Sequence, residues 1–198
     1  AELAQQVDGA YPGEIKVADL SGPDGTPDGI ISGEDRTILG SDVPDVFGGI
    51  NNRFEFAGFD LSIFMYYRLG HMIDSRLSSD QATMQGRYNN IDVDYWTINN
   101  PTNDYPRPNI NQERPQKHTT LRYQDGSYWK LRNVTLGYNF PSSIAEKLKM
   151  QSLRLYATAQ NPWFTSKYET YDPENAGSIG TGDVPSSKLY MVGINFQF

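Results

Sequence analysis

Apolar and polar side chains alternate along five stretches of this chain, with the period of two that is typical of β-strands with one apolar face. The last stretch places every second side chain on one face up to the terminal phenylalanine, Phe198. No run of about eighteen apolar residues occurs, so the sequence excludes a transmembrane helix. The sequence therefore predicts an all-β protein. The five predicted strands are Gly48 to Phe56, Phe59 to Leu69, Tyr128 to Phe140, Leu153 to Asn161 and Lys188 to Phe198.

The first two strands are separated only by Ala57-Gly58, which predicts a β-hairpin with a tight turn. If Phe56 faces Phe59 across this turn, the pairing of all the other residues in the hairpin follows. One surface then carries Phe54 opposite Leu61, Asn52 opposite Ile63 and Ile50 opposite Met65, and the other carries Asn51, Arg53, Glu55, Asp60 and Ser62. The first surface is apolar except for Asn52.

The connections between the strands alternate between short and long. Nearly sixty residues rich in Asn, Asp, Pro and Arg follow the second strand, whereas Pro141 to Ser152 is a short link. Long structureless loops count against a compact soluble domain. They are typical of outer-membrane β-barrels, whose periplasmic turns are short and whose external loops are long. We therefore predict an antiparallel transmembrane β-barrel segment with extracellular loops at 1–46, 70–127 and 162–187, hairpins at 47–69 and 128–161, and a closing strand at 188–198.

A closed membrane barrel needs at least about eight strands. An open sheet edge in hydrocarbon leaves backbone N–H and C=O groups unpaired, which is costly. Five strands cannot close a barrel. We therefore expect this chain to be a piece of a longer polypeptide, or to pair with other chains.

Composition narrows the classes of function. The chain has 198 residues and a net charge of −7, with no basic run, which disfavours nucleic acid as a partner. It has no cysteine, which excludes disulfides, thiolate zinc sites and thiol nucleophiles. The aromatic content of 13% fits the aromatic girdles of membrane barrels. We expect Trp163, Tyr168 and Tyr171 to belong to such a girdle at the outer end of the fourth strand.

A succession of motifs runs along nearly the whole chain and resembles the C-terminal region of SusC/RagA-type TonB-linked outer-membrane proteins. The motifs are PGEIKVADLSG at 12–22, DGIISGEDRTILG at 28–40, FEFAGFDLSIF at 54–64, YWTINNPTNDYPRP at 95–108, DGSYWKLRNVTLGYNFP at 125–141, SLRLYATAQNPWFTSKYETYDPE at 152–174 and the terminal KLYMVGINFQF. Any one of them is weak alone, but their order and spacing together are specific.

The resemblance implies a barrel of 22 strands in the Gram-negative outer membrane, plugged by an N-terminal domain and energised through TonB. It also implies a SusD-like surface lipoprotein that caps the barrel and delivers oligosaccharides, or in some cases peptides. The plug and the segment that contacts TonB are absent from this chain. The chain is then expected to carry the last strands and loops of an importer without its energy-coupling parts.

One acidic segment, DLSGPDGTPDGIISGEDR, resembles a calcium-binding loop. Oxygen ligands at alternate positions can surround a calcium ion because the loop wraps around it, and Gly29 stands at the sharp turn. The segment departs from the calcium pattern through inserted residues such as Pro23 to Gly25. The alternative is an acidic surface loop whose Asp side chains form Asx turns. The candidate ligands are Asp19, Ser21, Asp28, the Ile30 carbonyl and Asp35.

The end of the chain resembles the signal by which the barrel-assembly machinery recognises its clients. Gly193, Phe196 and Phe198 stand at the expected places, although a polar residue is usual at the position of Met191. The alternative is that these are simply membrane-facing residues of a closing strand. A third reading is the last strand of a soluble β-sandwich.

Aromatic residues and an arginine gather before the third strand. Tyr95, Trp96, Tyr105 and Arg107 could stack on sugars, pack the loop, or meet the partner lipoprotein. We take them as the candidate substrate or partner loop.

Catalysis finds little support in the sequence. His71 and His118 lack a nearby partner with triad or metal spacing, and we expect each to be a loop residue.

The main alternative to a transporter is a soluble β-rich carbohydrate-binding module. A glycoside hydrolase would need two carboxylates that converge in a cleft. If the chain is a transporter, we expect one continuous apolar band on the exterior of the strands, whereas a soluble module must bury these residues against a second sheet. The residues of the band are Phe54, Leu61, Ile63, Val134, Leu136, Leu155, Val192, Ile194 and Phe196.

Overall fold

The computed structural model describes residues 11–75, 92–108, 120–168, 172–174 and 186–198. The chain divides into two compact units. The sheet unit comprises residues 41–73 and 125–198, and the loop unit comprises residues 1–40 and 74–124.

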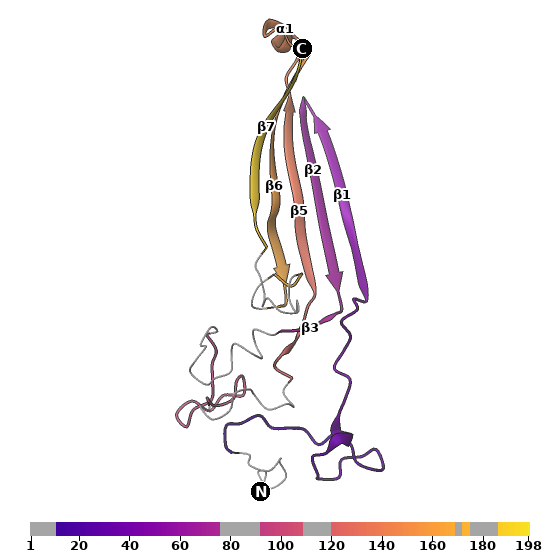
Figure 1. Ribbon diagram of the computed structural model, residues 1–198, viewed down its shortest axis with the longest axis vertical. Helices are drawn as coiled ribbons and strands as arrows, with labels where there is room; N and C mark the ends of the chain where they lie inside the picture. The colour runs from indigo at the N-terminus through magenta and orange to yellow at the C-terminus, as the bar shows by residue number, and fades with distance from the viewer. Residues whose placement is uncertain (1–10, 76–91, 109–119, 169–171, 175–185) are drawn as a thin grey trace. The chain divides into compact units, whose positions relative to one another are not determined.

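The sheet unit is built around one antiparallel sheet of five strands in the order β1-β2-β5-β6-β7 (Figure 1). Two further short strands, β3 and β4, pair with each other. No helix among the described residues is long and apolar enough to cross a membrane. The strands are β1 (Val46–Phe56), β2 (Phe59–Leu69), β3 (Met72–Asp74), β4 (Tyr123–Asp125), β5 (Tyr128–Asn139), β6 (Ser152–Ser166) and β7 (Leu189–Gln197).

The predicted register of the first hairpin is confirmed. Phe56 pairs with Phe59 and Phe54 pairs with Leu61, and Asn52 and Ile50 pair as expected. Ala57 and Gly58 both have positive φ, 49° and 85°. A two-residue turn of this kind matches the twist of the flanking strands, so it joins them without a slip in register.

One face of the sheet is a continuous apolar band that crosses all five strands. Its central row pairs Phe54 with Leu61, Leu61 with Leu136, Leu136 with Ala157, and Ala157 with Val192. Phe54 is 58% exposed, Leu136 49% and Val192 78%. Within the described part of the chain no second sheet covers this face. We call this the apolar face, and the opposite one, which carries Asp60, Lys130 and Arg154, the polar face.

The fourth predicted strand is longer than expected. The sequence predicts its end at Asn161, but β6 continues to Ser166. The pairing of β5 with β6 shifts between Leu131 and Asn133, and Asn161 has a φ of 48°. An Asn-Pro pair reads as a turn in sequence, whereas here a β-bulge absorbs Asn161 and Pro162 and lets the strand continue.

The short link between β5 and β6 contains a helix that the sequence analysis did not predict. This helix, α1, spans Ser142–Lys147 and buries Ala145. Figure 1 shows α1 and the chain end Phe198 at the same end of the sheet as the turn between β1 and β2. The short connections therefore share one end of the sheet, as the alternation of short and long connections requires.

Candidate functional site

Three segments of the loop unit enclose a pocket of about 420 Å³. The segments are residues 13–16, Trp96 with residues 102–106, and residues 120–121. The N–H of Trp96 donates to the carbonyl of Tyr105 at 3.0 Å, and the N–H of Arg107 donates to the carbonyl of Gly13 at 2.7 Å. The bond between Trp96 and Tyr105 joins the two parts of the second segment, and the bond between Arg107 and Gly13 ties the first segment to it.

The ring of Trp96 packs against the backbone of Gly13. A Cβ atom at Gly13 would lie 2.3 Å from Cε3 of Trp96, and Gly13 has a φ of +86°. Both the space and the backbone conformation therefore require glycine at this position. The indole is held in place by this contact and supports one side of the pocket.

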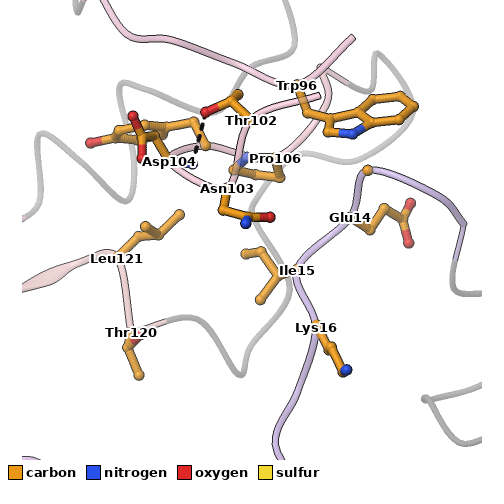
Figure 2. A pocket seen from close by; sticks show the side chains of 12 residues that line it. Glu14, Ile15, Lys16, Trp96, Thr102, Asn103, Asp104, Pro106, Thr120 and Leu121 are labelled. Atoms are coloured by element: carbon orange, nitrogen blue, oxygen red, sulfur yellow. Dashed lines mark hydrogen bonds between the residues drawn. The ribbon is translucent and has the colours of Figure 1, made fainter. Parts of the chain in front are cut away.

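Side chains of mixed character meet inside the pocket. Figure 2 shows Ile15, Asn103 and Leu121 converging on its middle, whereas Glu14 and Lys16 extend away from it. An amide offers both a donor and acceptors, and the two aliphatic side chains offer an apolar surface. This arrangement suits an uncharged polar group that has an apolar side.

The structure brings together part of the predicted aromatic loop. Trp96 and Tyr105 line the pocket, and Tyr95 forms a β-bridge with Tyr105 without lining it. Arg107 donates its backbone N–H to the carbonyl of Gly13. Ile15 and Leu121 were not predicted as site residues, because nothing in their local sequence links two residues so far apart in the chain.

The calcium-like segment is organised around Asp35. Its carboxylate accepts hydrogen bonds from the backbone N–H groups of Ser32 at 2.6 Å, Leu20 at 2.7 Å and Ser21 at 3.2 Å. These three bonds, that of Ser32 first, lower the pKa of Asp35. Asp35 also closes a capping box with Ser32 at the start of the short 3-10 helix η2 (Gly33–Asp35). Asp35 therefore acts here as the organiser of its own loop.

The other candidate ligands do not form a ready set for a metal. Asp19 accepts from the N–H of Gly29 at 2.6 Å, and Asp28 accepts from the N–H of Ile30 at 2.9 Å. Oδ1 of Asp19 is buried without a hydrogen-bond partner. Across the described ranges, no group of three or more His, Cys, Asp or Glu side chains could hold a metal ion. The bond between Ile30 and Asp28 is that of an Asx turn, whereas the bond between Gly29 and Asp19 spans the loop. Calcium binding stays a prediction.

On the polar face, a buried ion cluster surrounds Lys130 of β5. Its ammonium group lies 2.5 Å from Asp172, 2.8 Å from Glu174 and 2.9 Å from the hydroxyl of Ser186. Arg132 forms a second ion pair with Glu174. Burial acts to raise the pKa of Asp172, but hydrogen bonds from Lys130 and Ser186 outweigh it and lower this pKa. The cluster joins β5 to residues that follow β6.

A second charged cluster lies on the same face. Asp60 of β2 is only 7% exposed and accepts two hydrogen bonds from Arg154 of β6, at 2.6 and 3.0 Å. Asn139 donates to the same carboxylate at 3.1 Å. Bidentate pairs of this kind are among the stronger charge-assisted hydrogen bonds. The alternation of side chains predicts Asp60 on the polar surface of the hairpin but does not identify its partner.

No family model matches the chain. Among curated proteins, it is 31% identical over 201 residues to TonB-dependent receptor P3 of Formosa agariphila, which covers 94% of this chain and 19% of that protein. It is 24% identical over 179 residues to TonB-dependent receptor SusC of Bacteroides thetaiotaomicron, which covers 86% of this chain and 17% of SusC. The chain thus spans about a fifth of the length of these relatives.

Solved structures of the RagAB peptide importer resemble the chain in fold. The 'closed-closed' state matches with 26% identity and a TM-score of 0.70, over 94% of this chain and 20% of that chain. The 'open-open' state matches with 27% identity and a TM-score of 0.69, over 89% of this chain and 20% of that chain. The chain is a homologue of SusC/RagA-type TonB-dependent receptors. The resemblance carried by its motifs is confirmed, and so is the all-β antiparallel fold. The names of these relatives are those of receptors and importers, which fits the expectation that the chain is not an enzyme.

In this SusC/RagA homologue the three residues of the predicted assembly signal do not lie together. Phe196 lies on the apolar face of β7, Gly193 lies on its polar face, and Phe198 follows the end of the strand. Phe196 and Phe198 are exposed, 56% and 72%, and their ring centroids lie 5.4 Å apart. Gly193 lies on the polar face, opposite Tyr156 of β6. Whether the assembly machinery reads these residues stays a prediction.

One expectation about a single residue of the SusC/RagA homologue is wrong. Tyr168 is only 4% exposed and therefore packs inside the sheet unit, whereas Trp163 is 49% exposed as a girdle residue would be. His71 lies between β2 and β3, in a loop as expected, and is only 5% exposed because it lies against the ring of Tyr128. Tyr171 and His118 lie outside the described residues.

Proposed function

We propose that this chain forms part of an outer-membrane, TonB-dependent transporter that imports oligosaccharides or peptides together with a SusD-like surface lipoprotein. The observation that carries the proposal is the exposed apolar face, which runs from Phe54 to Val192 across five strands in a chain similar to SusC and RagAB. A row of exposed Phe, Leu and Val side chains suits a lipid surface, and the charged clusters of the polar face suit a barrel interior.

The pocket of the loop unit is the proposed contact for cargo or for the partner lipoprotein. Asn103 can exchange hydrogen bonds with a sugar hydroxyl or a peptide group, while Ile15 and Leu121 cover the apolar side of the same moiety. A pocket of about 420 Å³ lies within the usual range of small-molecule sites and is too small for a long oligomer. This pocket would therefore bind one part of the cargo, and other parts of the transporter would bind the rest.

A soluble carbohydrate-binding module is the alternative function, and the same pocket is the observation that favours it. Such a module would have to bury the apolar face against another layer. The exposed fractions of Leu136 and Val192, 49% and 78%, disfavour this alternative.

The proposal is tested on the complete polypeptide that carries this sequence. We expect it to fold into lipid vesicles and to copurify with a SusD-like lipoprotein. Asn103→Ala should lower uptake of the cargo, or retention of the lipoprotein, without a change in the amount of folded transporter. Ile98→Ala is the matched control, because Ile98 lies in the same segment, is 86% exposed and does not line the pocket.

Two results would contradict the proposal. A complete polypeptide that is monodisperse and melts cooperatively without detergent or lipid would exclude the membrane barrel. Equal uptake and equal lipoprotein retention by the Asn103 and Ile98 variants would remove the pocket from the transport path while leaving the barrel intact.

A further inference from the structure

A row of facing residues crosses the polar face close to the short-connection end of the sheet. Asp60 of β2 pairs with Gly137 of β5, Gly137 pairs with Tyr156 of β6, and Tyr156 pairs with Gly193 of β7. The single tyrosine of the row is therefore flanked on both sides by glycine. This arrangement leaves room for large side chains to lie flat across the neighbouring strands.

The ring of Tyr156 lies over Gly193. A Cβ atom on Gly193 would lie 2.4 Å from both Cζ and the hydroxyl oxygen of Tyr156. Gly193 is not among the residues with positive φ, so its backbone conformation is open to any residue. Glycine is required at this position by the ring that covers it and by nothing in its own backbone.

Gly137 serves a second crossing in the same way. A Cβ atom there would lie 2.4 Å from Nη2 of Arg154 and 2.5 Å from Oδ1 of Asp60. The guanidinium of Arg154 passes over Gly137 to reach Asp60, and it also lies 5.2 Å from the ring centroid of Tyr156. Contacts thus run without a break from Asp60 through Arg154 and Tyr156 to Gly193, across β2, β5, β6 and β7.

We propose that these contacts, which we call the polar-face clasp (Asp60, Gly137, Arg154, Tyr156 and Gly193), set the register of the terminal strand β7. The apolar face of β7 repeats large side chains at every second position from Tyr190 to Phe198. A shift of β7 by one residue along β6 would turn its apolar face inward and is strongly disfavoured. A shift by two residues keeps the apolar face outward, so the apolar face alone does not exclude this second register.

The polar face distinguishes the native register from the register shifted by two residues. Its β7 residues include Met191, Gly193 and Asn195, and only glycine leaves space beneath the ring of Tyr156. A slip of two would place Met191 or Asn195 under the ring and would clash. Gly193 is therefore a positioning residue whose requirement comes from Tyr156, independently of any reading by the assembly machinery. The inference rests on the barrel proposed above but not on its cargo.

The test is a double-mutant cycle on the complete polypeptide, refolded from urea into lipid vesicles without assembly machinery. Gly193→Ala should lower the folding equilibrium constant by roughly ten- to a hundredfold, as overpacking does. In a Tyr156→Ala background the same change should have little further effect, because the space is already free. Gly33→Ala is the matched glycine control, since a Cβ atom there meets nothing within 4 Å.

Register is read directly by cross-linking, because this chain contains no cysteine. The native register pairs Ala157 with Val192, and a slip of two pairs Ala157 with a neighbour such as Ile194. A157C with V192C should cross-link in the unvaried background. Tyr156→Ala should lower this cross-linking and raise that of A157C with I194C, because without the ring nothing on the polar face excludes Met191 or Asn195 from the position of Gly193.

Three outcomes would overturn the clasp. The first is an equal loss of folding from G193A with and without Tyr156. The second is a cross-linking pattern that Y156A leaves unchanged. The third is a G193A defect that appears only when assembly machinery is present. Failure of the unvaried polypeptide to fold into vesicles would instead contradict the proposed barrel, so the two proposals fail in distinguishable ways.

Discussion

The ammonium group of Lys130 lies 2.5 Å from Oδ2 of Asp172, and each of the two side chains is only 1% exposed. The two residues are 42 positions apart, so their contact fastens the chain after β6 to the middle of the sheet. Burying two charges is costly unless both are paired and hydrogen-bonded. Glu174 and Ser186 complete that pairing, which makes Lys130 the centre of the cluster.

The first prediction concerns the loss of this centre. Lys130→Met leaves Asp172 buried without its cation and should cost about 3–5 kcal/mol of unfolding free energy. Lys167→Met is the control, because Lys167 is 73% exposed and its pair with Asp125 is open to solvent; it should change little. Denaturant unfolding of the complete polypeptide in detergent measures both. Equal midpoints for the two variants would show that the cluster does not stabilise the fold.

The second prediction concerns the apolar face. Leu136 stands in the central row of the band, so Leu136→Arg would place a charge in the hydrocarbon. The change should make the free energy of folding into vesicles about 2–4 kcal/mol less favourable. Ser62→Arg is the control on the polar face, where a charge can stay hydrated. If both variants fold equally well into lipid, the band does not face the membrane.

The third prediction is a dependence of stability on pH. Burial first, and the positive charge of Arg68 second, lower the pKa of His71 below its ordinary value of 6.5, while Asp125 opposes them. Hydrogen bonds from Lys167 and Ser127 outweigh burial and lower the pKa of Asp125 to about 2, so its charge stays constant in this range. The neutral His71 therefore contributes stability above pH 6.5 that is lost as pH falls through 6.5 towards the folded pKa.

The loss should have a slope of at most about 1.4 kcal/mol per pH unit. Unfolding midpoints between pH 8 and pH 5 measure it, and the difference in slope between His71→Gln and the unvaried protein isolates the histidine. An identical slope in the two proteins would mean that His71 is not held neutral by its surroundings.

The fourth prediction concerns calcium. If the segment from Asp19 to Asp35 binds the ion, millimolar calcium should raise the thermal midpoint of the complete polypeptide, and Asp28→Ala should abolish this rise. Asp24→Ala is the control, because Asp24 bonds only to Thr26 in the inserted part of the loop. No response to calcium or to chelator in the unvaried protein would leave Asp35 with its structural role alone.

The sequence predicted the first hairpin down to its residue pairs, because a period of two and a turn of two residues leave one register in which Phe54 meets Leu61. It did not predict the continuation of β6 beyond Asn161, because a bulge there uses residues that locally favour a turn. It placed Tyr168 in a girdle because composition cannot distinguish an exposed aromatic ring from a buried one.

The candidate site was predicted only in part, for a related reason. Trp96 and Tyr105 share one motif and could be selected together, whereas Ile15 and Leu121 join them only through the folding of the loop unit. The backbone bond from Arg107 to Gly13 has no signature in either local sequence.

The sequence by itself determined that the chain is β-structured, two-faced and similar to SusC/RagA proteins, because the face on which a strand residue lies depends only on its neighbours in the chain. Only the tertiary structure decided which charges of the polar face meet. Arg154 and Asp60 are 94 positions apart, and their pairing requires β5 to lie between β2 and β6 with a glycine at the crossing. Contacts of this kind depend on strand order and register across the sheet, which no local pattern encodes.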